Sequence, residues 1–167
     1  LVKALGGRCI GTSRNVERLR AAEEQGLDVA LVDSGDGVAS QVMEATGGEG
    51  AAVVFDMLGA KALGDNMSAL RLEGSVVIIG LLTGAKSDIN LGQLLMRRLR
   101  VRAMTMRAQP LEERIRIAQI FSDRLAPLFE SGQLKPVLSL KHPHDGAPGA
   151  HAAMAANRHL GKIVLEL

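Results

Sequence analysis

Two glycine-containing turns follow apolar stretches and offer groups that could bind a ligand. The stretch AAVVFD ends at Asp56 and continues to Gly59, and the stretch GSVVIIG ends at Gly80 and continues to Leu82. If both stretches are parallel strands, the turns lie at the carboxyl ends of the strands, where open sheets of this kind bind their ligands. A strand-end aspartate commonly caps the next helix or satisfies loop amides, so we favour that role for Asp56 over a catalytic base. These turns therefore predict a binding site.

Few other side chains carry the patterns of known reactive sites. His142 and His144 in KHPHDG have a spacing that a metal could use, and His151 follows, but no cysteine or acidic partner has ligand spacing. We interpret them as solvated histidines and expect no zinc site. The single Cys9 lies in an apolar strand candidate and is interpreted as a small core residue. No nucleophile elbow and no recognisable cysteine and histidine dyad is present, so we predict no catalytic nucleophile.

Composition limits the classes of partner. The chain has 167 residues, of which 47% are hydrophobic, and these suffice for the core of one domain. It has three Phe and neither Tyr nor Trp, which argues against stacking surfaces for single-stranded nucleic acid. A net charge of +2 does not demand a polyanion. No apolar run has the length of a membrane span, and one cysteine fits a reducing, cytoplasmic setting, so we expect no membrane partner.

Strand and helix patterns alternate along the first half of the chain. After Asn15, a good helix cap, Val16, Leu19 and Ala22 give one apolar helix face, and the stretch between the two turns has helical spacing at Ala62, Met67 and Leu70. Alternation with short glycine-bearing connections predicts a doubly wound α/β fold, with a parallel sheet covered by helices on both faces. We expect strands over residues 8–12, 28–32, 51–56 and 74–80, with helices over 16–25 and 38–45 and a third helix within 61–74 between them.

The second half begins with a short helix and a charged strand. Asn90 can cap the helix LGQLLMRR, and Arg98, Arg100 and Arg102 alternate along LRVRAMTM, as is typical of a sheet edge. A long helix is expected over 111–130 with a kink at Pro127, followed by a strand over 136–140, a helix over 147–156 and a final strand over 161–167. The opening LVKALGG looks like the end of a helix, so we expect the chain to be a fragment.

Several of these motifs, in this order, match one family. LVKALGGRCIGT, VVFDMLG and SVVIIGLLTGAK resemble the carboxyl-terminal portion of the zeta-crystallin-like NADPH:quinone oxidoreductases, in the medium-chain dehydrogenase/reductase superfamily. LRVRAMTMRAQP and AANRHLGKIVLEL are most similar to the branch that includes the tumour-suppressor-inducible quinone oxidoreductase. The resemblance covers residues 1–167 and implies a single Rossmann-type cofactor domain. It also implies that the first strand with its glycine-rich turn, and an amino-terminal catalytic domain, are absent here.

The resemblance implies a preference for NADPH over NADH. A dinucleotide enzyme selects its cofactor just after RCIGT, where an acidic residue would bond the ribose 2′-hydroxyl; this chain has Thr12, Ser13 and Arg14. Arg18 matches the cationic residue that meets the 2′-phosphate. Asp33 stands where the family often has a tyrosine beside the adenosine, and it either pairs with an arginine or begins a turn, which we prefer. Spacing alone favours the interpretation of Arg14 and Arg18 as solvated cations on an amphipathic helix, and the resemblance reverses that preference.

The resemblance also assigns the rest of a cofactor cleft. Leu58 and Gly59 would pass the adenine side, Gly80, Leu81 and Leu82 would lie against the nicotinamide, and Met104, Thr105 and Met106 would offer backbone groups to its amide. The alternatives are a plain turn at Gly80 and core methionines at positions 104 and 106. Positions near the cofactor's far side are Asn157, His159, Gly161 and Lys162, although Asn157 could be a helix stop.

The function implied is hydride transfer from NADPH to a quinone or an enone, without zinc. Most substrate contacts would come from the catalytic domain, so we expect this chain alone to bind cofactor weakly and to be inactive. A homodimer would form through an edge strand that begins at Leu99 and ends at Met104. The rival interpretation is a non-enzymatic module that binds a nucleotide, or RNA through Arg97, Arg98, Arg100 and Arg102.

Overall fold

The computed structural model describes residues 1–35, 37–156 and 159–166. The chain divides into two compact units, one formed by Cys9–Ile115 and the other by Leu1–Arg8 with Arg116–Leu167. The single domain expected from the sequence stays a prediction.

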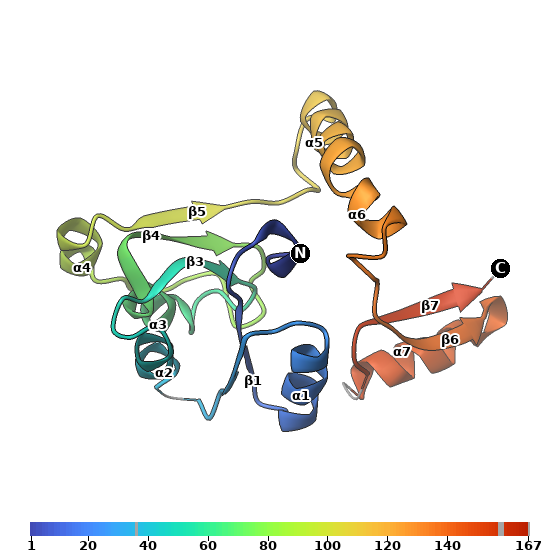
Figure 1. The fold of residues 1–167 in the computed structure, drawn as a ribbon, viewed down its shortest axis with the longest axis horizontal. Coiled ribbons are helices and arrows are strands. Elements are labelled where there is room, and N and C mark those ends of the chain that lie inside the picture. Colours follow the sequence, from blue (N-terminus) through green and yellow to red (C-terminus); the bar gives the residue numbers. More distant parts are fainter. Residues whose placement is uncertain (36, 157–158, 167) are drawn as a thin grey trace. The chain divides into compact units, whose positions relative to one another are not determined.

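The first sheet of the Cys9–Ile115 unit pairs β1 (Ile10–Ser13) with β2 (Val29–Val32). The two strands are parallel and joined through α1 (Val16–Glu24), and α2 (Val38–Ala45) follows β2 (Figure 1). The side chain of Asn15 accepts a hydrogen bond from the Arg18 amide at 3.1 Å, which confirms the predicted cap. Cys9 is a free, half-buried cysteine beside β1.

The second sheet has the order β3-β4-β5, and all its pairs are parallel (Figure 1). It consists of β3 (Ala51–Asp56), β4 (Leu70–Ile78) and β5 (Arg100–Ala103). The helix α3 (Leu63–Ser68) connects β3 to β4, and α4 (Leu91–Met96) precedes β5. Asn90 caps α4 by accepting from the Gln93 amide at 3.0 Å, as predicted. The edge position predicted for the arginine-rich strand is confirmed for β5.

The core of this unit lies on the face of the second sheet that α3 covers. Met67, Leu70 and Val76 are fully buried there, and Leu63 and Leu99 complete the cluster. On β3, residues that alternate with Val54 point away from this core, and Phe55 is 61% exposed. We expected both faces to be covered because the strands are apolar throughout. Helix cover of the first face is confirmed within this unit, and cover of the second face of β3 stays a prediction.

Several strand boundaries differ from the sequence prediction by a few residues, and two of them bear on the site. β4 begins at Leu70 and not at residue 74, because the Ala51 amide pairs with the Ala69 carbonyl at 2.8 Å as soon as α3 ends. Apolar spacing at Leu70 therefore reflected the buried start of a strand and not a further helical turn. β5 ends at Ala103, so the methionines at 104 and 106 follow the strand.

The other unit contains a parallel pair covered by a helix. β6 (Leu138–Pro143) pairs with β7 (Lys162–Glu166), and α7 (Ala147–Ala155) joins them after a short η2 (His144–Gly146). Lys141 and Glu166 form an exposed ion pair at 2.7 Å between the two strands. Residues 1–7 contain only a 3-10 turn, η1 (Lys3–Leu5).

A broken helix spans the division between the units. It is split into α5 (Leu111–Arg124) and α6 (Ala126–Glu130). Pro127 lies in the first turn of α6, where it lacks the amide that would continue the helix, so the predicted kink is confirmed. The predicted α/β class with parallel strands is confirmed, although the described strands form three sheets and not one.

Candidate functional site

The carboxyl ends of β3 and β4 continue into two loops that are hydrogen-bonded to each other. We call residues 57–61 the first rim loop and residues 80–84 the second rim loop. The ladder of β3 and β4 ends with the Ile79 amide on the Asp56 carbonyl at 2.7 Å. Beyond it, the second rim loop donates from Leu82 to Met57 (3.2 Å) and from Thr83 to Leu58 (2.7 Å), and the first donates from Ala60 to Gly84 (3.1 Å). The pairing of the strands is thus prolonged into the rim.

The side chain of Asp56 binds backbone amides of the first rim loop. This side chain is 2% exposed, and its Oδ1 accepts from the amides of Leu58 at 2.8 Å and Gly59 at 3.0 Å. The Oδ2 atom is also buried and has no hydrogen-bond partner in the described part of the chain. The role that the sequence favoured, satisfaction of loop amides, is confirmed.

The glycines allow the two rim loops to approach closely. Gly59 has a φ of 80°, and a Cβ added there would lie 2.8 Å from the Gly84 carbonyl oxygen and 2.9 Å from a methyl of Leu81. A Cβ on Gly80 would lie 2.8 Å from the Met57 carbonyl oxygen. Any larger residue at either position would therefore push the loops apart.

Thr83 links the two loops through its side chain, a role that the sequence did not indicate. Its hydroxyl donates to the Leu58 carbonyl at 2.8 Å and accepts from the Lys61 amide at 3.2 Å. These bonds join residues more than twenty positions apart, so no local pattern in the sequence could have identified them. Ser87 adds a hydroxyl bond to the Ala60 carbonyl at 2.8 Å.

The rim carries exposed apolar side chains. Leu82 is 77% exposed, and Met104 and Met106, which follow β5, are 45% and 43% exposed. The alternative of core methionines is therefore wrong in this unit. The remaining members, Met57, Leu58 and Leu81, are exposed as well. Thr105 lies between the two methionines and is exposed too. Clustered exposed apolar groups at strand ends are typical of a binding surface.

The end of β1 is polar and cationic. Thr12 and Ser13 close the strand, and the Ser13 hydroxyl accepts from the Asn15 amide at 3.1 Å. Arg14 is exposed, and Arg18 is half-buried in the first turn of α1. After β2, Asp33 accepts from the Gly35 amide at 2.9 Å, so the turn that we preferred is present.

The remaining predicted site residues lie in the other unit. His159 is half-buried, and Gly161, with a φ of 85°, lies against the Val137 carbonyl, where a side chain would collide. The Lys162 amide donates to that carbonyl at 2.8 Å. Asn157 lies outside the described residues.

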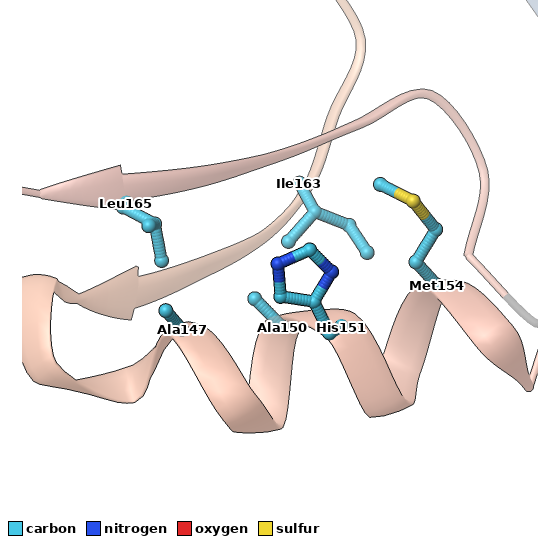
Figure 2. A pocket seen from close by; sticks show the side chains of 6 residues that line it. All are labelled: Ala147, Ala150, His151, Met154, Ile163 and Leu165. Carbon is cyan, nitrogen blue, oxygen red and sulfur yellow. The ribbon is translucent and has the colours of Figure 1, made fainter.

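A small apolar hollow of about 150 Å³ also belongs to this unit (Figure 2). It lies between α7 and β7, where Ala147, Ala150, His151 and Met154 of the helix face Ile163 and Leu165 of the strand. None of the predicted cofactor residues lines it. Among the described residues, no cluster of histidine, cysteine, aspartate or glutamate is placed to hold a metal ion. Nor does any described helix combine the length and apolar character needed to cross a membrane.

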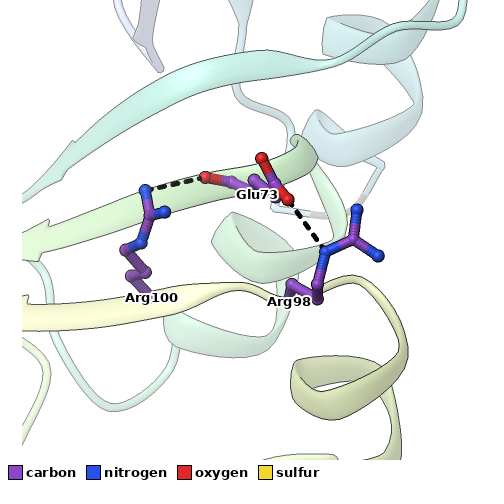
Figure 3. Close-up of polar contacts among 3 residues, drawn as sticks. All are labelled: Glu73, Arg98 and Arg100. Carbon is purple, nitrogen blue, oxygen red and sulfur yellow. Dashed lines mark hydrogen bonds and ion pairs between the residues drawn. The ribbon is translucent and has the colours of Figure 1, made fainter.

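The arginines before and along β5 bind the chain itself. Arg97 donates to the carbonyls of Met67, Ser68 and Leu70 at the end of α3. Arg98 pairs with the Glu73 carboxylate at 2.9 Å, and Arg100 donates to the Glu73 carbonyl at 3.3 Å (Figure 3). The hydrogen bond and charge of Arg98 lower the pKa of Glu73 below its ordinary value. Glu73, within β4, and Arg98, in the turn after α4, both have positive φ, so this contact joins two positions of strained backbone.

Residues 1–121 match the family model of the zinc-binding dehydrogenases. The chain belongs to this family. The quinone oxidoreductase of Pseudomonas aeruginosa is 30% identical over 165 residues, which are 98% of this chain and 50% of the relative. The 2-haloacrylate reductase of a Burkholderia species is 28% identical over 96% of this chain and 48% of the relative. The chain thus spans about half the length of the curated relatives it matches.

Solved structures of similar proteins share the fold. A quinone oxidoreductase of Pseudomonas syringae superposes with a TM-score of 0.79 at 28% identity, over 99% of this chain and 51% of that one. A mycobacterial protein complexed with NADPH gives a TM-score of 0.79 at 26% identity, over 99% of this chain and 52% of that one. The Rossmann-type class and the resemblance to quinone oxidoreductases are confirmed. The tumour-suppressor-inducible branch stays a prediction.

Proposed function

We propose that this chain is the cofactor-binding part of an NADPH-dependent quinone oxidoreductase. The observation that carries the proposal is the interlocked, apolar rim at the carboxyl ends of β3 and β4, in a member of the zinc-binding dehydrogenase family. Relatives named quinone oxidoreductase and a structural neighbour complexed with NADPH support it. The intact protein would transfer hydride to a quinone or a related enone. We expect this chain alone to be inactive.

The residues present fit a dinucleotide. Gly59 is buried and lets the two rim loops pack closely, Leu81 and Leu82 offer aliphatic surface that excludes water from a nicotinamide ring, and Arg14 and Arg18 offer positive charge for a 2′-phosphate. Methionines 104 and 106 would line the nicotinamide side. The cofactor, when bound, supplies the hydride, and the protein's part is to orient it and to exclude water.

The strand order supports a further strand between the first two sheets. In the common Rossmann order 3-2-1-4-5-6, removal of strand 1 leaves a pair and a triplet. The pair β1-β2 and the triplet β3-β4-β5 correspond to strands 2-3 and 4-5-6 of that order. We propose that the missing strand, with its glycine-rich turn, completes the sheet and holds the pyrophosphate in the full-length protein.

The RNA-binding alternative is not favoured. Three of the four arginines on which it rests have intramolecular partners, because Arg97 caps α3 while Arg98 and Arg100 bind Glu73. We further propose a cytoplasmic homodimer and a reaction without zinc. Because the family is named for zinc binding, the metal content of purified, active full-length protein tests the last point.

The cofactor preference is tested by exchanging Arg18 for alanine in the full-length protein. We expect kcat/KM with a quinone acceptor to favour NADPH over NADH in the wild type, and Arg18→Ala to lower the value for NADPH roughly 10-fold or more, as loss of a charged hydrogen bond would. Arg20→Ala removes an exposed arginine from the same helix and serves as the control. An unchanged cofactor ratio in Arg18→Ala would remove Arg18 from the site.

A further inference from the structure

The two rim loops would contact different halves of the proposed cofactor. The first rim loop would lie on the adenosine side and the second on the nicotinamide side. Their backbones are cross-linked by hydrogen bonds at Met57, Leu58 and Ala60, and the packing at Gly59 leaves no room for a side chain between them. A displacement of one loop must therefore move the other or break these contacts.

Thr83 makes the only side-chain link from the second rim loop to two points of the first within the described residues. Its hydroxyl donates to Leu58 and accepts from Lys61, so both functions of the group are used. Its own amide also donates to the Leu58 carbonyl at 2.7 Å. Thr83 is half-buried, while its neighbours Leu82 and Gly84 are exposed. Its hydroxyl thus fixes the first loop and leaves the ligand-facing side chains free.

We propose that Thr83 is a positioning residue that couples the adenosine and nicotinamide walls of the cleft. This inference rests on the proposed function. Occupation of the first rim loop by the adenosine half of NADPH orders residues 57–61, and the Thr83 hydroxyl transmits that order to residues 80–84. The nicotinamide wall is therefore formed before the nicotinamide arrives.

The experiment uses full-length wild type, Thr83→Val and Thr83→Ser. Amide hydrogen exchange is measured with and without saturating adenosine 2′,5′-bisphosphate, which carries the adenosine half and no nicotinamide. We expect this probe to slow exchange in residues 80–84 of the wild type and Thr83→Ser, and to slow it clearly less in Thr83→Val, in which the backbone hydrogen bonds between the loops remain. Without ligand, the Lys61 amide should exchange roughly 10-fold faster in Thr83→Val, because it loses its acceptor. In steady-state kinetics, Thr83→Val should have a higher KM for NADPH than the wild type, and Thr83→Ser should have the wild-type KM.

Thr46→Val is the matched control. The Thr46 hydroxyl also donates to a carbonyl, that of Val42 at 2.8 Å, and accepts from a backbone amide, that of Gly50 at 2.8 Å, but it lies before the opposite end of β3. It should lower stability without altering the transfer of protection between the loops. If transfer is undiminished in Thr83→Val, or is reduced equally in Thr46→Val, the inference is overturned although the wild type binds the probe. If the wild type binds neither the probe nor NADPH, the proposed function fails as well.

Discussion

At the scale of single residues, the exposed carboxylate of Glu73 forms an ion pair with Arg98. Its carboxylate contacts Arg98 at 2.9 Å, and both side chains are more than half exposed, so the pair is weakened by solvent. Because Arg98 lowers the pKa of Glu73 in the folded protein, the ion pair stabilises the fold above the pKa of the unfolded carboxyl, about 4.3. That stabilisation is lost as the pH falls through the lowered pKa.

Glu73→Gln should therefore lower stability slightly at neutral pH and have no effect in acid. The hydrogen bond from Arg100 to the Glu73 carbonyl persists in this variant, which isolates the carboxylate. Urea unfolding of both proteins at pH 7 and at about pH 3 measures the difference, with Glu49→Gln as an exposed control. A difference that grows in acid would contradict the sign of the pKa shift.

Gly59 is the residue on which the contact between the rim loops depends most. Gly59→Ala combines a positive φ with a Cβ that would lie 2.8 Å from a backbone oxygen. We expect it to cost about 1–3 kcal/mol in the free energy of unfolding. Gly64→Ala is the contrasting variant, because Gly64 lies within α3 with open space around it, and it should stabilise by up to about 1 kcal/mol. Equal effects in denaturant unfolding would show that the loops can separate freely.

At the scale of elements, α3 anchors the second sheet through one methionine. Met67 is fully buried and packs in the cluster with Leu63, Leu70 and Val76. Met67→Ala should lower the free energy of unfolding by about 2–5 kcal/mol, since it removes a core side chain and leaves a cavity. Met96→Ala, on the exposed side of α4, should change it by less than about 0.5 kcal/mol. Thermal unfolding monitored by circular dichroism measures the stability of both variants. Similar losses of stability in the two would mean that the core lies elsewhere.

The sequence predicted the elements whose signals are local. Asn15 and Asn90 identified helix starts, Pro127 identified the helix break, and the apolar stretch before Asp56 identified β3 with its correct ends. It failed where a distant contact decides the boundary. Leu70 continues the helical spacing of α3, yet pairing with β3 draws it into β4. The competition between continuing the helix and pairing with β3 cannot be seen in the local sequence around Leu70.

At the scale of the whole molecule, the parallel α/β class followed from alternation, but the division into three sheets did not. Apolar strands predict cover on both faces, and they do not say which segment provides it. Phe55, on the second face of β3, is 61% exposed. The sequence predicted which backbone positions form the candidate site, because the residues that end a strand are recognisable from a short stretch of sequence. Its cross-link through Thr83 was missed, since it joins distant loops.

The free edge of β5 offers the last test, of the proposed homodimer. The Met104 amide donates to Ile78 at 3.1 Å, so by the alternation of a parallel strand the amides of Arg100 and Arg102 also face β4. The amides of Val101 and Ala103 then face outward, where a second copy could pair with them. Ala103→Pro removes an outward donor without removing a bond to β4, and proline is tolerated at such edges.

We expect full-length wild type to be a dimer and Ala103→Pro to weaken the dimer at least roughly 10-fold, because symmetry removes one hydrogen bond from each copy. Ala103→Val retains the amide and should remain dimeric, which separates the loss of the donor from a change of side chain. Sedimentation equilibrium across a range of concentrations gives the dissociation constants. A monomeric wild type would refute the dimer. A dimer unaffected by Ala103→Pro would place the interface on another surface. The exposed Arg100–Ala103 edge would then face solvent, and its arginines would prevent other strands from pairing with it.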